Sequence, residues 1–186
     1  MIIRLADCPS QPWKNGLGRT REIAVQPSGA SSNDFLWRVS IAEVDSAAPF
    51  SIFPGIDRHI VLLDGAGFAM TLDEARMHAL TTLFAPFSFP GEARVDVALA
   101  DGATRDFNLM VRRRHGRGQV AVWHGPTTRR PDQATQLVFC ARGVIDISDG
   151  QLGPGDACRI ASTDNNPLTL HDGAVALAVR IEPRPG

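Results

Sequence analysis

Short segments rich in Val, Ile and Phe dominate this chain and constrain its fold more than any other feature. Ten of them have the length of a strand and turn residues at both ends, namely 20–25, 35–44, 58–63, 68–72, 94–99, 120–123, 136–141, 144–148, 157–161 and 174–181. Gly and Pro residues separate them, several at intervals of about ten residues, as in β-sandwiches and small barrels. The sequence predicts an all-β fold with very little helix, and the segment 73–84 is the best candidate for a short helix.

Two polar, turn-rich and basic stretches suggest where the chain divides. They lie at 112–119 and 125–132, on either side of one short apolar run. We expect a larger first domain at 1–118 and a smaller second domain at 119–186. With 186 residues, of which 44% are hydrophobic and 21% charged, the chain can bury an ordinary soluble core.

The overall charge excludes some classes of partner. The formal net charge is −1, which argues against a general binder of nucleic acid or of anionic membranes, because such binding needs many phosphate contacts. The apolar runs are too short for a membrane span. The first 13 residues contain Asp7 and two prolines where a signal peptide needs an apolar core, so we expect a cytoplasmic protein. Cys8, Cys140 and Cys158 are far apart, which favours free, mostly buried thiols.

The patterns of metal and nucleophile sites are missing from the sequence. The histidines form no HxH pair and lie near no Glu at metal-ligand spacing; they are His59, His78, His115, His124 and His171. There is no G-x-S-x-G motif, and the short 16–18 Gly-Leu-Gly stretch lacks the rest of a phosphate-binding fingerprint. We therefore predict no metal, no cofactor and no nucleophilic triad.

One stretch, 12–23, contains the only lysine of the chain. Lys14 stands between Trp13 and an Asn15-Gly16 pair, which favours a tight turn with positive φ. A compact ammonium held there can reach over a cavity mouth, where the planar fork of arginine is no substitute. The alternative is that a single lysine is left there by chance.

Strand alternation groups further candidates. In 35–44, Arg38 and Ser40 share one face, opposite Trp37, and suit a carboxylate if that face lines a barrel interior; otherwise the face is solvated. Asp57 and Arg58 are adjacent and face opposite sides of their strand, so Arg58 faces either the cavity or water.

The stretch 106–115, at the end of the first half, holds further candidates whose position in a cavity or in solvent the sequence leaves open. Asn108 and Met110 share one strand face. The three arginines at 112–114 can hold phosphate, although such a run before His-Gly-Arg-Gly is more typical of a solvated loop.

Four stretches, 12–23, 35–44, 49–67 and 106–113, together resemble the HutD/Ves family of bacterial proteins in order and spacing, and 141–161 fits its second half more loosely. The resemblance implies a bicupin fold, in which two cupin-like β-barrels lie in one chain and the first holds the pocket. It also implies a cupin without the usual metal ligands and an association with histidine utilisation, where the proposed role is to bind a pathway intermediate and restrain pathway output.

Matching the motifs position by position marks further positions as well, among them Thr20, Asp106, Asn108, Met110 and Arg113. From the matches we select ten candidate ligand-binding residues and no catalytic residue: Trp13, Lys14, Asn15, Glu22, Trp37, Arg38, Ser40, Phe53, Asp57 and Arg58. The chain departs from the family pattern at Leu17 and Ala48, where the family usually has glycine. Leu17 can narrow the pocket entrance or alter the turn.

We expect a metal-independent protein, monomeric or homodimeric, that binds a small carboxylate metabolite such as urocanate or a formyl- or formimino-glutamate. One alternative is a metal-free cupin hydrolase or isomerase that uses Lys14 and Glu22 as acid and base. The other is a protein-interaction module whose pocket is vestigial.

Overall fold

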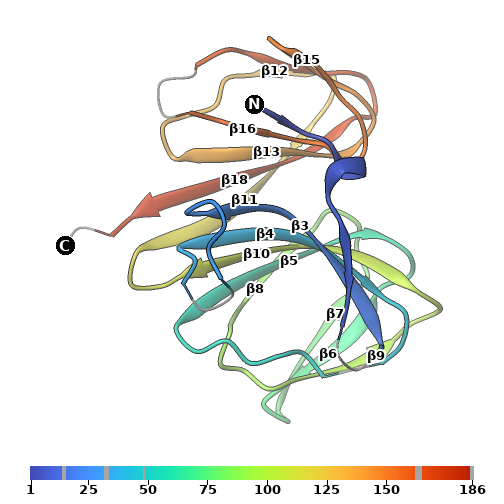
Figure 1. Ribbon diagram of the computed structural model, residues 1–186. Helices are drawn as coiled ribbons and strands as arrows, with labels where there is room; N and C mark the ends of the chain where they lie inside the picture. The colour runs from blue at the N-terminus through green and yellow to red at the C-terminus, as the bar shows by residue number, and fades with distance from the viewer. Residues whose placement is uncertain (14–15, 32–33, 48, 162–164, 185–186) are drawn as a thin grey trace. The chain divides into compact units, whose positions relative to one another are not determined.

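The computed structural model describes the whole chain except residues 14–15, 32–33, 48, 162–164 and 185–186 (Figure 1). The described parts confirm the all-β prediction. Besides strands they hold a single-turn 3₁₀ helix, η1 (Leu5–Asp7). No helix in these parts is long and apolar enough to cross a membrane.

The chain forms two compact units. One is Pro9–Arg117, and the other joins Met1–Cys8 to Gly118–Pro185. The first eight residues belong to the second unit because β1 (Ile2–Ile3) pairs with β16 (Ala157–Arg159), with Ile2 opposite Cys158. Composition does not reveal this long-range pairing, and the boundary expected from it placed these residues in the first half. That each unit is a separate cupin barrel stays a prediction.

The unit Pro9–Arg117 has two antiparallel sheets in the described residues. The larger has the order β2 (Ser10–Pro12), β3 (Gly18–Gln26), β4 (Trp37–Val44), β10 (Thr104–Arg112), β5 (Ile56–Asp64) and β8 (Pro86–Pro90). The smaller has the order β7 (Arg76–Leu80), β6 (Phe68–Leu72) and β9 (Val95–Leu99). Strand β10, far along the sequence, lies between β4 and β5, so three distant stretches form the middle of the larger sheet (Figure 1).

The second unit also has two sheets in its described part. One has the order β1, β16, β13 (Thr135–Arg142), β18 (Val175–Pro183) and β11 (Gly116–His124). The other has the order β12 (Thr127–Arg129), β17 (Leu168–Leu170), β14 (Ile145–Ile147) and β15 (Gly150–Leu152). Its core includes Cys140 and Cys158. Both, like Cys8, are buried, as predicted, and form no disulfide. Burial raises the pKa of Cys140 to about 12, so this thiol is inert at neutral pH.

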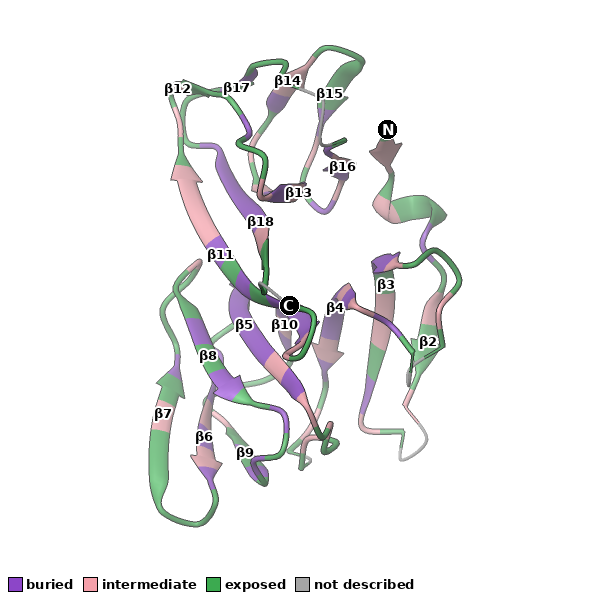
Figure 2. Ribbon diagram, turned by 90° about the vertical axis from the view of Figure 1, so that its left-hand side faces the viewer, coloured by how far each residue is buried: buried purple, intermediate pink, exposed green. Residues whose placement is uncertain are grey.

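Alternating side chains build the core of the unit Pro9–Arg117. Strand β8 reads exposed, buried, exposed, buried, exposed, with Phe87 and Phe89 inward (Figure 2). These rings join Ile60 of the larger sheet and Phe68 and Met70 of the smaller in one cluster. The core therefore fills the space between the two sheets, as the period-2 pattern requires.

The expected helix at 73–84 is wrong. Residues Arg76–Leu80 form β7, which pairs with β6 so that Phe68 lies opposite Leu80. Asp73 and Glu74 have φ of 50° and 59°, the left-handed conformation of a hairpin turn, which no right-handed helix contains. The apolar spacing of 77, 80, 83 and 84 resembles a helical period, yet Met77 is 75% exposed.

Candidate ligand-binding site

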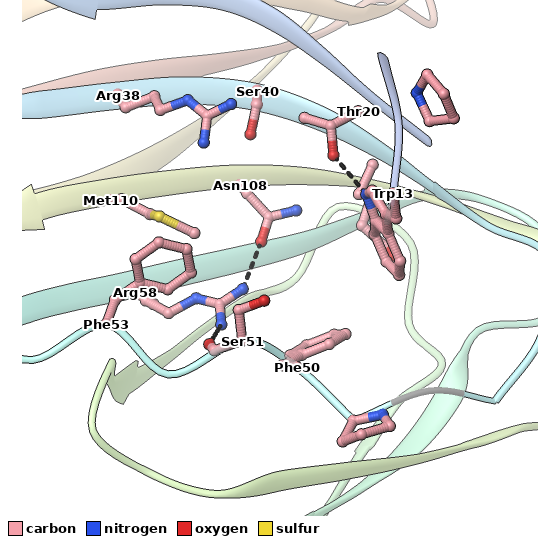
Figure 3. A pocket seen from close by; sticks show the side chains of 14 residues that line it. Trp13, Thr20, Arg38, Ser40, Phe50, Ser51, Phe53, Arg58, Asn108 and Met110 are labelled. Atoms are coloured by element: carbon pink, nitrogen blue, oxygen red, sulfur yellow. Dashed lines mark hydrogen bonds between the residues drawn. The ribbon is translucent and has the colours of Figure 1, made fainter. Parts of the chain in front are cut away.

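A cavity of about 490 Å³ lies in the unit Pro9–Arg117 (Figure 3). Its lining comes from β2, β3, β4, β5 and β10, from the turn after β2 and from the segment before β5. The lining residues are Pro12, Trp13, Thr20, Arg38, Ser40, Ala42, Pro49, Phe50, Ser51, Phe53, Arg58, Asp106, Asn108 and Met110.

Strand register arranges the polar lining in levels across the sheet. Met110 of β10 lies opposite both Arg38 of β4 and Arg58 of β5, which places the two arginines on one level. Asn108 lies opposite Ser40 on the next level. Since every second residue of a strand faces the same side, alternation brings all five into the cavity.

A third level completes the sheet side of the cavity. Asp106 lies opposite Ala42, which in turn lies opposite Thr20 of β3. The cavity thus has an arginine end, at Arg38 and Arg58, and an aspartate end, at Asp106.

Arg58 is buried at the arginine end with weak polar contacts. It is 6% exposed. Its Nη1 donates to the Ser51 carbonyl and its Nη2 to Asn108 Oδ1, both at 3.4 Å, and Nε has no hydrogen-bond partner among the described residues. N–H···O hydrogen bonds in proteins typically measure 2.7–3.2 Å from donor to acceptor, so these two are long.

Aromatic rings surround the same guanidinium. Its Cζ lies 5.0 Å, 5.6 Å and 4.9 Å from the ring centroids of Phe50, Phe53 and Phe89, and the first two belong to the segment that covers the cavity. These cation–π contacts hold the group in place without neutralising it.

Burial therefore leaves a cation without an anion. No described carboxylate forms an ion pair with Arg58, and burial lowers its pKa to about 10. At neutral pH the group is still charged, and a buried, unpaired charge costs folding free energy. An anionic occupant of the cavity would remove that cost.

Arg38 differs because it has a partner. Its Nε donates to Glu22 Oε2 at 2.8 Å, and their side chains are 18% and 40% exposed. Glu22 reaches it from the adjacent β3. The pair orients Arg38 along the cavity wall, and its other guanidinium nitrogens can still donate to a ligand.

Asp106 is a buried carboxyl at the opposite end. It has no exposed surface. Thr104 Oγ1 donates to its Oδ1 at 3.2 Å, while Oδ2 has no partner among the described residues. Burial raises the pKa of Asp106 to about 7, because the charged form loses its hydration.

Trp13 presents an apolar ring to the cavity near Thr20. Its indole Nε1 donates to Thr20 Oγ1 at 2.7 Å, which satisfies its polar atom and leaves the ring face for a ligand. Main-chain bonds of 3.0 Å and 2.9 Å join Trp13 to Gly16 and Gly18, and Gly16 has φ of 72°. The predicted positive φ at this turn is confirmed for Gly16.

Gly18 fixes the position of the Trp13 ring. A Cβ there would lie 2.6 Å from the Glu43 carbonyl oxygen and 3.0 Å from the ring. We expect Gly18→Ala to lower the free energy of unfolding by about 1–3 kcal/mol, as overpacking does, and to weaken ligand binding by displacing Trp13. Urea denaturation measures the first effect.

Gly153→Ala is the matched control, because the nearest atom to its added Cβ is 3.9 Å away. It should change stability by no more than about 0.5 kcal/mol. Equal effects of the two substitutions would contradict the steric argument.

The structure brings half of the predicted site residues to the cavity: Trp13, Arg38, Ser40, Phe53 and Arg58. That they bind a ligand stays a prediction. Lys14 and Asn15 lie outside the described residues, as does Ala48.

Three predicted residues lie elsewhere. Trp37 is 5% exposed and does not line the cavity, because alternation turns it away from Arg38. Asp57 also faces away and accepts a hydrogen bond of 2.7 Å from Arg113 Nε. Glu22 does not line the cavity, and among the described residues its hydrogen bond goes to Arg38.

Several lining residues were not among the ten candidates. The most informative are Asp106, Asn108 and Met110, which share one face of β10, and Thr20 and Phe50. Strand alternation in the sequence already places Asn108 and Met110 on one face. The same alternation, continued two residues toward the N-terminus, places Asp106 on that face as well.

The arginines at 112–114 do not gather around a common point. Arg112 Nε donates to the Phe35 carbonyl at 2.9 Å, and Arg113 binds both Asp57 and Glu92. The described residues also hold no group of three His, Cys, Asp or Glu side chains placed to share a metal ion.

The fold and the cavity define a cupin-like β protein with a mixed polar and aromatic pocket. The chain belongs to the HutD family, whose model matches residues 5–178. It is 34% identical over 168 residues to an uncharacterised 21.2 kDa protein of the hutC 3′ region of Pseudomonas putida, with 88% of this chain and 87% of that one covered. It is 44% identical over 147 residues to protein Ves of Cronobacter sakazakii, with 78% of each covered. Its structure matches that of HutD from Pseudomonas fluorescens with a TM-score of 0.85 and 29% identity, over 100% of this chain and 99% of that one.

Proposed function

We propose that this protein is a metal-independent binding protein for a small carboxylate metabolite, held in the cavity of the unit Pro9–Arg117. The observation that carries the proposal is Arg58, a residue that is 6% exposed and whose guanidinium has no carboxylate partner among the described residues. A ligand carboxylate would supply the missing anion and a bidentate partner.

The rest of the lining supports an organic ligand over an inorganic anion. Phe50, Phe53, Trp13 and Met110 give the cavity apolar walls, and a few polar groups such as Ser40 and Asn108 converge on it. Small-molecule pockets commonly combine these two features. A volume of about 490 Å³ also exceeds what one bare anion fills.

Family membership supports a biological context. The resemblance to the HutD/Ves family implies an association with histidine utilisation, and membership of the HutD family supports that context. We propose that the ligand is urocanate or a formyl- or formimino-glutamate, and that its binding regulates this pathway. Each of these compounds carries at least one carboxylate and a planar nitrogenous group.

The test is thermal unfolding of the purified protein against a panel of small carboxylates that includes urocanate and formylglutamate. A ligand at one hundred times its dissociation constant adds about 2.7 kcal/mol of stability. For a chain of this size each kcal/mol raises the midpoint by about 2–4 °C, so a shift of about 5 °C or more is expected. No shift with any carboxylate would contradict the proposal and favour the protein-interaction module.

The same panel separates binding from turnover. A binding protein returns each carboxylate unchanged, as NMR of the mixture would show, whereas product formation would favour the acid–base enzyme with Lys14 and Glu22. Lys14→Arg tests the lysine directly, and a smaller midpoint shift in this variant would assign it to the ligand.

A further inference from the structure

The polar groups of the cavity are separated along the strands. The two arginines share the level of Met110, Asn108 lies one level further, and Asp106 lies one level beyond that. Arg58 reaches toward the middle level, where its Nη2 contacts Asn108 Oδ1. Since two residues of a strand span about 7 Å, the level of Asn108 and the level of Asp106 are roughly 7 Å apart along β10.

The carboxyl of Asp106 is only half satisfied. Thr104 supplies one hydrogen bond to Oδ1, and Oδ2 lacks any partner in the described part of the chain although the residue is completely buried. Buried polar atoms normally have partners, and an unsatisfied one costs free energy. Because Asp106 lines the cavity, a hydrogen-bond donor on the occupant can reach it once the side chains that cover its carboxyl move.

The surroundings of the aspartate end suit a flat ring. Trp13 and Thr20 lie on the side of the cavity away from Arg38 and Arg58 (Figure 3). The indole N–H is already bound to Thr20, so Trp13 offers its ring face, and Ala42 on the sheet leaves room beside it. A planar N–H group can stack there and still donate to Asp106.

We propose that Asp106 accepts a hydrogen bond from an N–H of the ligand, so that the cavity selects carboxylates that carry an N–H donor at the end remote from the carboxylate. This inference rests on the proposed function and names its ligand class. The burial that raises the pKa of Asp106 to about 7 is consistent with a carboxylate of which one oxygen lacks a hydrogen-bond donor.

The test compares three carboxylates of similar shape by calorimetric titration at pH 8. Urocanate has a ring N–H, whereas 3-(2-furyl)acrylate and cinnamate have none. We expect the wild-type protein to bind urocanate about 10- to 100-fold more tightly than furylacrylate, because the latter leaves a buried charged acceptor unpaired. In Asp106→Leu, which has a similar shape without the acceptor, the ratio should fall to near one, with Asp106→Asn between.

Asp57→Asn is the control, since it changes a carboxyl of the same sheet that does not line the cavity, and its ratio should equal that of the wild type. Equal binding of urocanate and furylacrylate by the wild type, or an unchanged ratio in Asp106→Leu, would overturn the role of Asp106 and leave the carboxylate proposal standing. Failure of all three to bind, together with no thermal shift from formylglutamate, would overturn both. The wild-type comparison decides the matter even if Asp106→Leu does not fold.

Discussion

Replacing Arg58 by methionine is expected to stabilise the ligand-free protein by about 1–3 kcal/mol and to weaken carboxylate binding at least about 30-fold. Burial lowers the pKa of Arg58 to about 10. A lowered pKa in a base means that the folded state disfavours the charged form, and this cost is present in full at every pH well below 10. It corresponds to about 3 kcal/mol, and methionine removes it.

The net gain is smaller than that cost because the substitution also removes favourable contacts. The cation–π contacts with Phe50, Phe53 and Phe89 and two long hydrogen bonds are lost. Methionine is unbranched and fills most of the same space, so no large cavity forms. Urea denaturation of the free protein and calorimetric titration with a carboxylate measure the two effects.

Arg113→Met is the matched control. Arg113 does not line the cavity, and its guanidinium binds Asp57 and Glu92 at 2.7 Å and 3.0 Å. This substitution should lower stability slightly and leave binding unchanged. If Arg58→Met instead destabilised the protein by more than about 1 kcal/mol, the charge of Arg58 would serve the stability of the fold. If the variant bound the carboxylate as tightly as the wild type, a different cation would hold the anion.

Asp106→Asn is expected to stabilise the ligand-free protein in a way that depends on pH. The pKa of Asp106 is raised to about 7 by burial, from an ordinary value near 4. A raised pKa in an acid means that the folded state binds the proton more tightly, so its stability falls as pH rises from about 4 to about 7 and then levels off. The full difference is about 4 kcal/mol.

The measurement is the free energy of unfolding of both proteins at pH 4 and at pH 8. The variant should be nearly as stable as the wild type at pH 4 and more stable at pH 8 by up to about 4 kcal/mol. Asparagine still accepts the hydrogen bond from Thr104, so that contact is kept.

Glu92→Gln is a control of the opposite sign. The side-chain hydrogen bond from Arg113 holds the pKa of Glu92 down to about 2. A depressed pKa stabilises the fold above the ordinary value of the acid, and this contribution disappears as pH falls through the folded value. The glutamine variant should therefore be the less stable protein at pH 8. A flat difference between wild type and Asp106→Asn from pH 4 to 8 would show that Asp106 titrates normally.

Much of the fold follows from local sequence. Segments such as 58–63 and 68–72 alternate or run apolar over strand length between turn residues, and they are strands β5 and β6. The expected helix at 73–84 is wrong for a local reason. Asp73 and Glu74 both adopt the left-handed conformation and form a hairpin turn, which the apolar spacing of the segment does not reveal.

Part of the site also follows from local sequence. Alternation alone turned Arg38 and Ser40 to one face of their strand and Trp37 to the other, as the cavity lining has them. The same rule applied to β10 would have added Asp106 to Asn108 and Met110. It could not decide which of the two faces was the inner one, because both faces of this strand are largely buried.

The sequence by itself determined many of the strands and which side chains share a face, because these depend on neighbours a few residues away. It also carried the four motifs that identify the family. Only the tertiary structure decided which charges have partners. Glu22 of β3 forms an ion pair with Arg38 of the adjacent β4, and Asp57 accepts a hydrogen bond from Arg113, which does not line the cavity. Arg58 is buried without a described anion because β10 and the segment that holds Phe50 and Phe53 pack around it. Burial and the identity of a charge's partner are set by residues distant in the chain, and the chemistry of this cavity depends on both.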